Sequence, residues 1–447
     1  MKLGTVYSAD KKELIYSFIV IGMLFLSFHD GFISALGLYT LASVAVYGAI
    51  CAVLPFVIKS KIYTLDCLWL MLIFYIVIRN QEFRNGVYLS FMAIMFSLLT
   101  IILLNQSDYW IDTARKALIF FSAEHIIFGF LFLALPSVYT RLIISHYPAD
   151  ARANLRNYLA SRIFMGLTEH YTSSGTYCSI AVIIAFSYFL LNPKSKKNLF
   201  FLLITLTALV LTQKRAPLAF IVMTFSAVYF IYKKVDVKTV IKFLALIIVA
   251  GIVVIILYNK VELINNAFSR FVESADEKDV TNGRLPLYSQ AIDIIKKYPI
   301  LGMGWGGYRY RFAYGLTTQN NPILNAHDIY LQIFAETGII GLIAFLSFFI
   351  YFLSVTIKII KSGSMKMMSM NEKWCIVFSV CMQIWFLLSG VFENVLYSPQ
   401  TTVPYALSVA MALKMSRKFS GIRKSVTLKY SDFESIIKFI KGMFQKA

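Results

Sequence analysis

Long apolar runs separated by short polar breaks fill most of this chain. Runs long enough to cross a bilayer as a helix, which takes about 20 residues, predict about twelve membrane spans. The pattern is not the short alternation of an outer-membrane barrel, so we expect an all-α, polytopic membrane protein. The approximate limits of the spans are 13–29, 32–57, 62–79, 87–104, 115–135, 173–191, 198–213, 217–232, 240–258, 330–357, 373–391 and 401–415.

Lysine and arginine gather in every second loop of this predicted topology, so most of them lie on one side of the membrane. Because cytoplasmic loops carry the excess of basic residues, the basic side is predicted to be cytoplasmic, with both termini on it. The first apolar run ends without a small-x-small cleavage site and is predicted to be a retained span. Two long segments, 136–172 and 259–329, then lie on the outer face together with the short turn 213–217.

The topology divides the chain into four parts. We expect a membrane bundle of about nine spans at 1–258 and an extracytoplasmic loop with an amphipathic helix at 259–329. The C-terminal spans follow at 330–415, and a basic amphipathic tail at 416–447 has the spacing of an interfacial anchor helix.

Composition supports the membrane class and excludes others. The chain is 58% hydrophobic and only 15% charged, whereas a soluble domain carries roughly 25% charged residues. The net charge of +20 is explained by basic cytoplasmic loops that face anionic lipid. The basic residues are scattered among loops, so no nucleic-acid partner is expected. The five cysteines have no metal-ligand or disulfide spacing, and neither a metal nor a cofactor is expected.

A basic pair on the outer face runs against the charge rule. Lys214 and Arg215 occupy the turn LTQKRAP between two spans. A guanidinium offers a planar, permanently charged fork for phosphate oxygens, so the pair is a candidate anion site. The alternative is a surface arginine that snorkels at the interface.

A second candidate cation opens an amphipathic helix. Arg284 follows the turn Asn282-Gly283, and a helix start favours anions. The glycine-rich turn at 299–307 comes next and has neither a Walker nor a dinucleotide spacing. It is interpreted as a packing turn, with the shaping of a sugar or phosphate pocket as the alternative. The predicted apolar face of the helix, which lies against either the membrane or the bundle, consists of Leu285, Tyr288, Ala291, Ile292 and Ile295.

His327 is the leading catalytic candidate. It heads an apolar helix in the sequence NAHDIYLQIFAETGIIG, close to two outward-facing arginines. A histidine can take a proton from an attacking hydroxyl near neutral pH. Asp328 and Glu336 are candidates to orient or tune it.

Two other groups of polar residues are weaker candidates. Arg162 and its neighbours in the first outer segment fit either lipid anchoring or contact with a substrate phosphate. Ionisable residues inside predicted spans are costly and usually face the bundle interior. The first group is Arg152, Arg156, Arg162, Glu169 and His170, and the second is Asp66, Glu124 and His125.

Residues 173–353 resemble the bacterial O-antigen ligase and polymerase superfamily. The members of this superfamily are integral-membrane glycosyltransferases of the C type. The resemblance lies in TQKRA after a span, GRL at the start of the amphipathic helix, and KKYPILGMGWGGYR. The most specific match is AHDIYLQIFAETGIIG, a helix headed by histidine. Asp328 stands where the family often has asparagine, which alters the tuning of His327 but not the chemistry.

The resemblance implies a metal-independent enzyme in the bacterial cytoplasmic (inner) membrane that acts at the outer face. Arg215 and Arg284 would hold the diphosphate of an undecaprenyl-pyrophosphate-linked glycan, and His327 would activate the acceptor hydroxyl. The implied partners are an acceptor glycan or glycolipid, membrane lipids, a chain-length regulator and a flippase. Further candidates for contact with diphosphate or sugar are Lys214, Arg162, Asp328 and Glu336.

The GMGWG turn and the HDIYLQIFAETG segment look more like those of a polymerase, which moves a growing chain onto the next lipid-linked repeat unit of an O-antigen or capsule-type polysaccharide. The alternative within the superfamily is a ligase, which moves the finished chain onto lipid A–core or another acceptor. A transporter or flippase of lipid-linked sugars is the alternative from another class, since it would also have about twelve spans. Transporters concentrate their sites near the midplane and on internal repeats, and neither feature is visible in this sequence.

Overall fold

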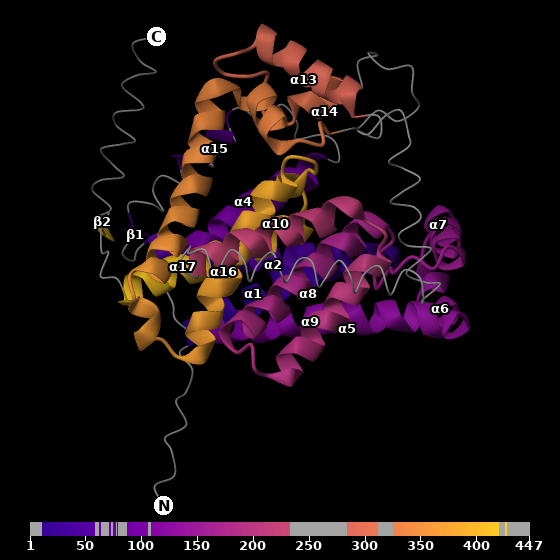
Figure 1. Ribbon diagram of the computed structural model, residues 1–447. Coiled ribbons are helices and arrows are strands. Elements are labelled where there is room, and N and C mark those ends of the chain that lie inside the picture. Colours follow the sequence, from indigo (N-terminus) through magenta and orange to yellow (C-terminus); the bar gives the residue numbers. More distant parts are fainter. Residues whose placement is uncertain are drawn as a thin grey trace, which may run out of the picture.

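Helices account for nearly all the described residues of the computed structural model. The structure describes residues 11–58, 62–63, 71–72, 75–76, 78, 87–105, 109–232, 284–311, 325–419 and 425–426. Two short strands, β1 (Ile62–Tyr63) and β2 (Ser425–Val426), pair in antiparallel fashion. The fold of the described part is therefore an α-helical bundle, as the hydrophobic pattern predicts (Figure 1).

Among the described residues, ten long helices make the bundle, and shorter elements connect them. The long helices are α1 (Lys11–Ala35), α2 (Tyr39–Ile58), α4 (Val87–Leu104), α5 (Trp110–Ala134), α8 (Tyr171–Leu191), α9 (Lys196–Leu211), α10 (Arg215–Tyr232), α15 (Ile329–Lys361), α16 (Met370–Ser389) and α17 (Pro399–Phe419). The short elements are α6 (Pro136–Leu142), η1 (Ile144–His146), α7 (Ala149–Ala160), α13 (Leu285–Lys297), α14 (Gly307–Arg311), η3 (Ser364–Met367) and η4 (Val395–Tyr397).

Six helices within the described residues are long and apolar enough to cross a membrane: α1, α5, α8, α10, α15 and α16. The chain is thus a multi-pass membrane protein by the length and composition of its helices. Predicted span 240–258, the tail helix and most of span 62–79 and of the loop 259–329 lie outside the described residues. The other predicted spans each coincide with a long helix.

The predicted break between the first two spans is wrong by several residues. The prediction ends the first span at residue 29, but α1 continues to Ala35 with a kink at His29. The break lies at Gly37, whose φ of +69° is readily adopted only by a residue without a Cβ. Asp30, predicted in a loop, is therefore part of α1.

The centre of the bundle is made by α16 and α17. Most side chains of both helices are buried, and α4, α8, α10 and α15 pack around them. Phe386 of α16 stacks on Tyr405 of α17 with ring centroids 4.1 Å apart. Polar groups in the loop that joins these two helices are consequently held in place by the most buried part of the fold.

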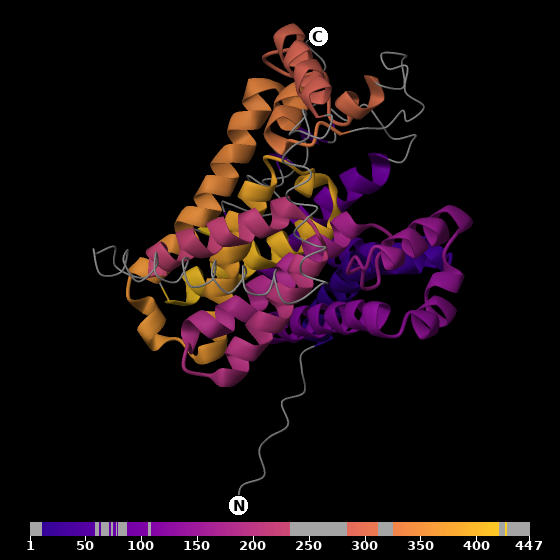
Figure 2. The same ribbon diagram turned by 45° about the vertical axis from the view of Figure 1, so that its right-hand side comes forward.

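Helix α13 lies against one end of α15, apart from the main bundle (Figures 1 and 2). Its buried positions are Leu287, Ala291 and Ile294. Of the predicted apolar face, Ala291 is buried, whereas Leu285 and Ile292 are 59% and 42% exposed. The predicted face thus lies only partly against the bundle.

Candidate functional site

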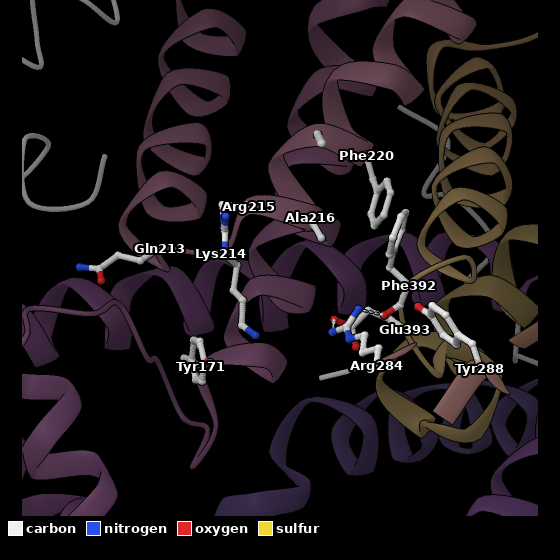
Figure 3. Close-up of a pocket in the computed structure, with 11 residues that line it drawn as sticks. Tyr171, Gln213, Lys214, Arg215, Ala216, Phe220, Arg284, Tyr288, Phe392 and Glu393 are labelled. Atoms are coloured by element: carbon white, nitrogen blue, oxygen red, sulfur yellow. Dashed lines mark hydrogen bonds and ion pairs between the residues drawn. The ribbon is translucent and has the colours of Figure 1, made fainter. Parts of the chain in front are cut away.

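A cavity of about 380 Å³ opens where α8, α10, α13 and the α16–η4 loop meet. We call it the main cavity. Figure 3 shows Lys214 pointing across it towards Arg284, which lies beside Glu393. The lining residues are Tyr171, Gln213, Lys214, Arg215, Ala216, Ala219, Phe220, Arg284, Tyr288, Phe392 and Glu393.

Lys214 and Arg215 enter the main cavity from the start of α10. Gln213 just before them has a left-handed φ of +57°, an unfavourable conformation for a residue with a side chain. It is held by a hydrogen bond from Gln213 Nε2 to the carbonyl of Ser161, 3.2 Å long. The Lys214 ammonium lies 3.9 Å from the centre of the Tyr171 ring. The turn thus places two cations beside the free N–H groups of a helix start, where an anion is favoured.

Arg284 reaches the main cavity from the opposite side. It is the N-cap residue of α13, and Nη1 donates a 2.5 Å hydrogen bond to the carbonyl of Phe392. Nη2 lies 3.4 Å from Glu393 Oε1. Two contacts from one guanidinium fix its plane, and its remaining N–H groups are donors of the kind that bind a phosphate.

His327 lies near the Glu393 carboxylate that also contacts Arg284. Its Nδ1 is 3.9 Å from Glu393 Oε2, and its backbone N–H donates to Asn394 Oδ1 at 3.1 Å. Its φ of +55° is left-handed, a costly conformation that the surrounding contacts maintain. Burial lowers the pKa of His327, and the nearby Arg284 lowers it further, while Glu393 opposes the change. The imidazole is therefore neutral near pH 7, as a proton acceptor must be.

Asp328 acts as the cap of α15. Its carboxylate accepts hydrogen bonds from the backbone N–H groups of Tyr330 and Leu331, at 2.8 and 3.0 Å. Burial raises its pKa, and the two backbone donors oppose that change. The position that often holds asparagine in the family is thus filled by another good N-cap residue.

Glu336 is completely buried. Its carboxylate accepts hydrogen bonds from Tyr397 Oη at 2.7 Å and from Gln332 Nε2 at 3.1 Å. The carbonyl oxygen of the Gln332 side chain accepts from the backbone N–H of Ala326, the residue before His327. Glu336 is consequently connected to the His327 loop through Gln332.

The glycine-rich turn packs its backbone directly onto α15. Met303 N–H donates to the carbonyl of Ala335, and Gly304 N–H donates to that of Glu336. Gly338 interrupts α15 with a φ of +67°, and a Cβ there would lie 2.1 Å from the carbonyl oxygen of Ile300. No residue of the turn lines the main cavity or the smaller cavity that adjoins it at Lys214. This agrees with the interpretation of the segment as a packing turn.

Other candidate residues lie elsewhere. Arg162 is exposed and does not line the main cavity. Glu124 pairs with His29 at 3.1 Å, and His125 approaches Ser174 at 3.3 Å, both inside the bundle. Asp66 lies outside the described residues.

The structure adds Glu393 and Asn394, which the sequence analysis missed. Both lie in the loop between α16 and η4 and contact His327, while Glu393 also contacts Arg284. A signal was present, because the span count places 392–400 on the same side as His327. An acidic residue in that short loop was overlooked because it belongs to no motif of the resemblance.

The main cavity carries an excess of positive charge. Three cations (Lys214, Arg215 and Arg284) line it with one carboxylate, that of Glu393. Within the described part of the chain, no carboxylate forms an ion pair with Lys214 or Arg215. No cluster of metal-ligating side chains occurs among those residues either. An anionic group is the ligand that this electrostatic field favours.

Fold and site together define a multi-pass membrane protein with a cationic cavity. Residues 200–346 match the family described as O-antigen ligase. The match contains Lys214, Arg215, Arg284 and His327, and it confirms the resemblance to the O-antigen ligase and polymerase superfamily. It indicates an enzyme of the O-antigen ligase or polymerase type, which acts on lipid-linked glycans. No curated protein matches the chain.

Proposed function

We propose that this protein is a polysaccharide polymerase that transfers a glycan from undecaprenyl pyrophosphate to the sugar of the next lipid-linked repeat unit. The observation that carries the proposal is that Arg284 and His327 share one carboxylate, Glu393, at the wall of a cavity with three cations. The site thus combines an anion-binding wall with a neutral imidazole, which are the two elements that glycosyl transfer from a diphosphate needs.

In the proposed reaction, an acceptor hydroxyl oxygen attacks the anomeric carbon of the donor sugar. The bond between that carbon and the diphosphate oxygen breaks, and the diphosphate leaves with the electron pair. The hydroxyl proton passes to the neutral His327 imidazole. Each bond that breaks is thereby matched by one that forms, and the products are the extended glycan and undecaprenyl pyrophosphate.

The cations stabilise the leaving group. Negative charge grows on the bridging oxygen as the bond breaks, and preorganised donors placed there lower the barrier. Lys214, Arg215 and Arg284 are in position to supply them. Arg162, in the outer segment, is proposed as an additional contact for a phosphate or a lipid head group.

Asp328 and Glu336 are proposed to position His327. Asp328 fixes the start of α15 directly after the histidine, and Glu336 fixes the loop before it through Gln332. In this proposal the site faces the outside of the cytoplasmic (inner) membrane, with both termini cytoplasmic. A flippase delivers the donor, and a chain-length regulator acts with the enzyme.

The test compares undecaprenyl-linked glycans in host cells that carry wild-type protein or His327→Ala at equal protein level. A polymerase without its base leaves single repeat units on the lipid carrier. Accumulation of long lipid-linked chains would identify a ligase instead. An unchanged glycan profile would remove His327 from the mechanism and favour the transporter alternative.

A further inference from the structure

A second cavity of about 150 Å³ adjoins the main cavity between α8, α10, α16 and the start of α17. We call it the inner cavity. The two cavities share Lys214, Phe220 and Glu393 as lining residues. The inner cavity has less than half the volume of the main cavity and suits a small group such as one sugar ring.

Hydroxyl and amide groups dominate the polar lining of the inner cavity. They come from Thr172 and Thr176 of α8, Ser389 of α16, and the segment that contains Asn394, Ser398, Gln400 and Thr401. Neutral groups that both donate and accept hydrogen bonds suit the hydroxyls of a sugar. Charged groups lie only at the wall shared with the main cavity.

Two buried polar atoms in this lining have no hydrogen-bond partner. They are the indole Nε1 of Trp385 and the hydroxyl of Ser389, whose residues are 2% and 3% exposed. An unpaired buried polar group is energetically costly, so most such groups in native proteins have a partner. Both residues line the inner cavity, so a ligand bound there lies beside them.

Other residues of the lining are held by the bundle. Gln400 Nε2 donates to Asp30 Oδ2 at 2.7 Å, and Asp30 also accepts from the Tyr177 hydroxyl at 3.4 Å. The amide of Gln400 therefore keeps one orientation before any ligand arrives. Such preorganisation reduces the entropy lost on binding.

We propose that the inner cavity binds the sugar joined to the diphosphate, with Trp385 and Ser389 as specificity-determining residues. The inference rests on the proposed function, since it takes the main cavity as the diphosphate site. With the diphosphate in one cavity and its sugar in the other, the bond that breaks lies at the shared wall. That wall carries Glu393, beside which His327 can receive the acceptor proton.

The experiment measures binding and transfer by full-length protein in lipid nanodiscs. The two probes are undecaprenyl pyrophosphate and the same lipid carrying one repeat unit of the host glycan. Trp385→Phe removes the indole N–H and keeps an aromatic ring, and Ser389→Ala removes only the hydroxyl. Each variant should bind the glycan-linked lipid about tenfold more weakly, equal to ~1.4 kcal/mol. Each should bind the sugar-free lipid as wild type does.

Matched controls lie on the same helix away from the cavity. Trp374 is a buried tryptophan whose Nε1 donates to the Ile184 carbonyl, and Ser379 is a buried serine with backbone partners. Trp374→Phe and Ser379→Ala should preserve the wild-type ratio of the two affinities. Unchanged binding of the sugar-free lipid by the cavity variants shows that they remain folded.

The outcomes separate this inference from the proposed function. If wild-type protein binds neither lipid, the proposed function fails. If it binds both and the cavity variants preserve the affinity ratio, the sugar site is not in the inner cavity. If those variants change only the KM of the acceptor, the inner cavity is an acceptor site and the donor assignment is overturned.

Discussion

His327 Nδ1 lies 3.9 Å from Glu393 Oε2, and the other oxygen of the same carboxylate lies 3.4 Å from Arg284 Nη2. One carboxylate thus connects the proposed base to a proposed diphosphate ligand. Each of the three side chains is partly buried, with 21–32% of its surface exposed, so their charges are only partly screened. A change at any one of them therefore alters the protonation of the histidine.

The first prediction concerns pH. Burial and Arg284 lower the pKa of His327, so the base is neutral above that pKa and is lost as the pH falls through it. The acid limb of kcat/KM should lie below pH ~6.5, the ordinary pKa of histidine. Because Glu393 raises the pKa, Glu393→Gln should move the limb to lower pH. Transfer rates measured across a pH series report this directly.

The control for that series is Glu372→Gln. Glu372 lies at the start of α16 and pairs with Lys418, away from the cavity. Its substitution should not move the limb. A limb that moves to higher pH in Glu393→Gln would contradict the assignment of His327 as the titrating base.

The second prediction ranks the arginines. Removal of one donor to a developing anion costs about 10²–10³ in kcat. Arg215→Ala and Arg284→Ala should each show a loss of this order, with weaker binding of undecaprenyl pyrophosphate. Arg162→Ala should show a smaller loss, since Arg162 is exposed outside the main cavity. Calorimetric titration with the sugar-free lipid, together with kcat, provides the comparison.

An equal loss in all three variants would contradict this ranking. It would indicate that the substrate extends from the main cavity to the outer segment that carries Arg162.

The helical class of the fold was predictable because lipid-spanning segments must be long and apolar, which is visible in any window of the sequence. The basic turn at Lys214 and the position of His327 were predictable because both conflict with their surroundings. Lys214 is a positive charge on the side of the membrane where the positive-inside rule predicts few. His327 is a polar residue at the start of an apolar helix. Local patterns of this kind need no knowledge of tertiary contacts.

The partners of these residues were not predictable. Glu393 meets His327 and Arg284 only because the end of α16 and helix α13 both pack beside the start of α15, a relationship that no spacing in the sequence encodes. The kink at Gly338 likewise depends on the glycine-rich turn at 299–307. This turn is distant from Gly338 in the sequence and contacts it only in the folded protein. The end of α1 was misjudged because Asp30 has a buried partner, Gln400, that comes from α17.

The third prediction tests Glu336 as a positioning residue. Glu336→Gln places an amide donor where Tyr397 and Gln332 also donate, so one buried group loses its partner. The free energy of unfolding of the variant should be lower than that of wild type by about 1–3 kcal/mol. The loop before His327 should also be less well held, so kcat should fall while KM for the donor stays near the wild-type value. A rise in KM with kcat unchanged would instead indicate direct contact with substrate.

The fourth prediction concerns the kink in α15. Gly338→Ala meets two penalties: a left-handed φ of +67° and a Cβ placed 2.1 Å from the Ile300 carbonyl oxygen. The left-handed conformation alone costs about 1–3 kcal/mol for a residue with a side chain. Since backbone atoms cannot move aside as a flexible side chain can, the clash should add to this cost. Thermal unfolding of the purified protein in detergent should show a clearly lower Tm.

Gly363 is the matched control for this substitution. Its φ is +75°, close to that of Gly338, but nothing lies within 4 Å of a Cβ built there. Gly363→Ala therefore carries only the conformational cost, and its Tm should lie between those of wild type and Gly338→Ala. Equal losses in the two variants would show that the close packing of the glycine-rich turn on α15 does not contribute to stability. That result would leave the turn free for the alternative role of shaping a sugar or phosphate pocket.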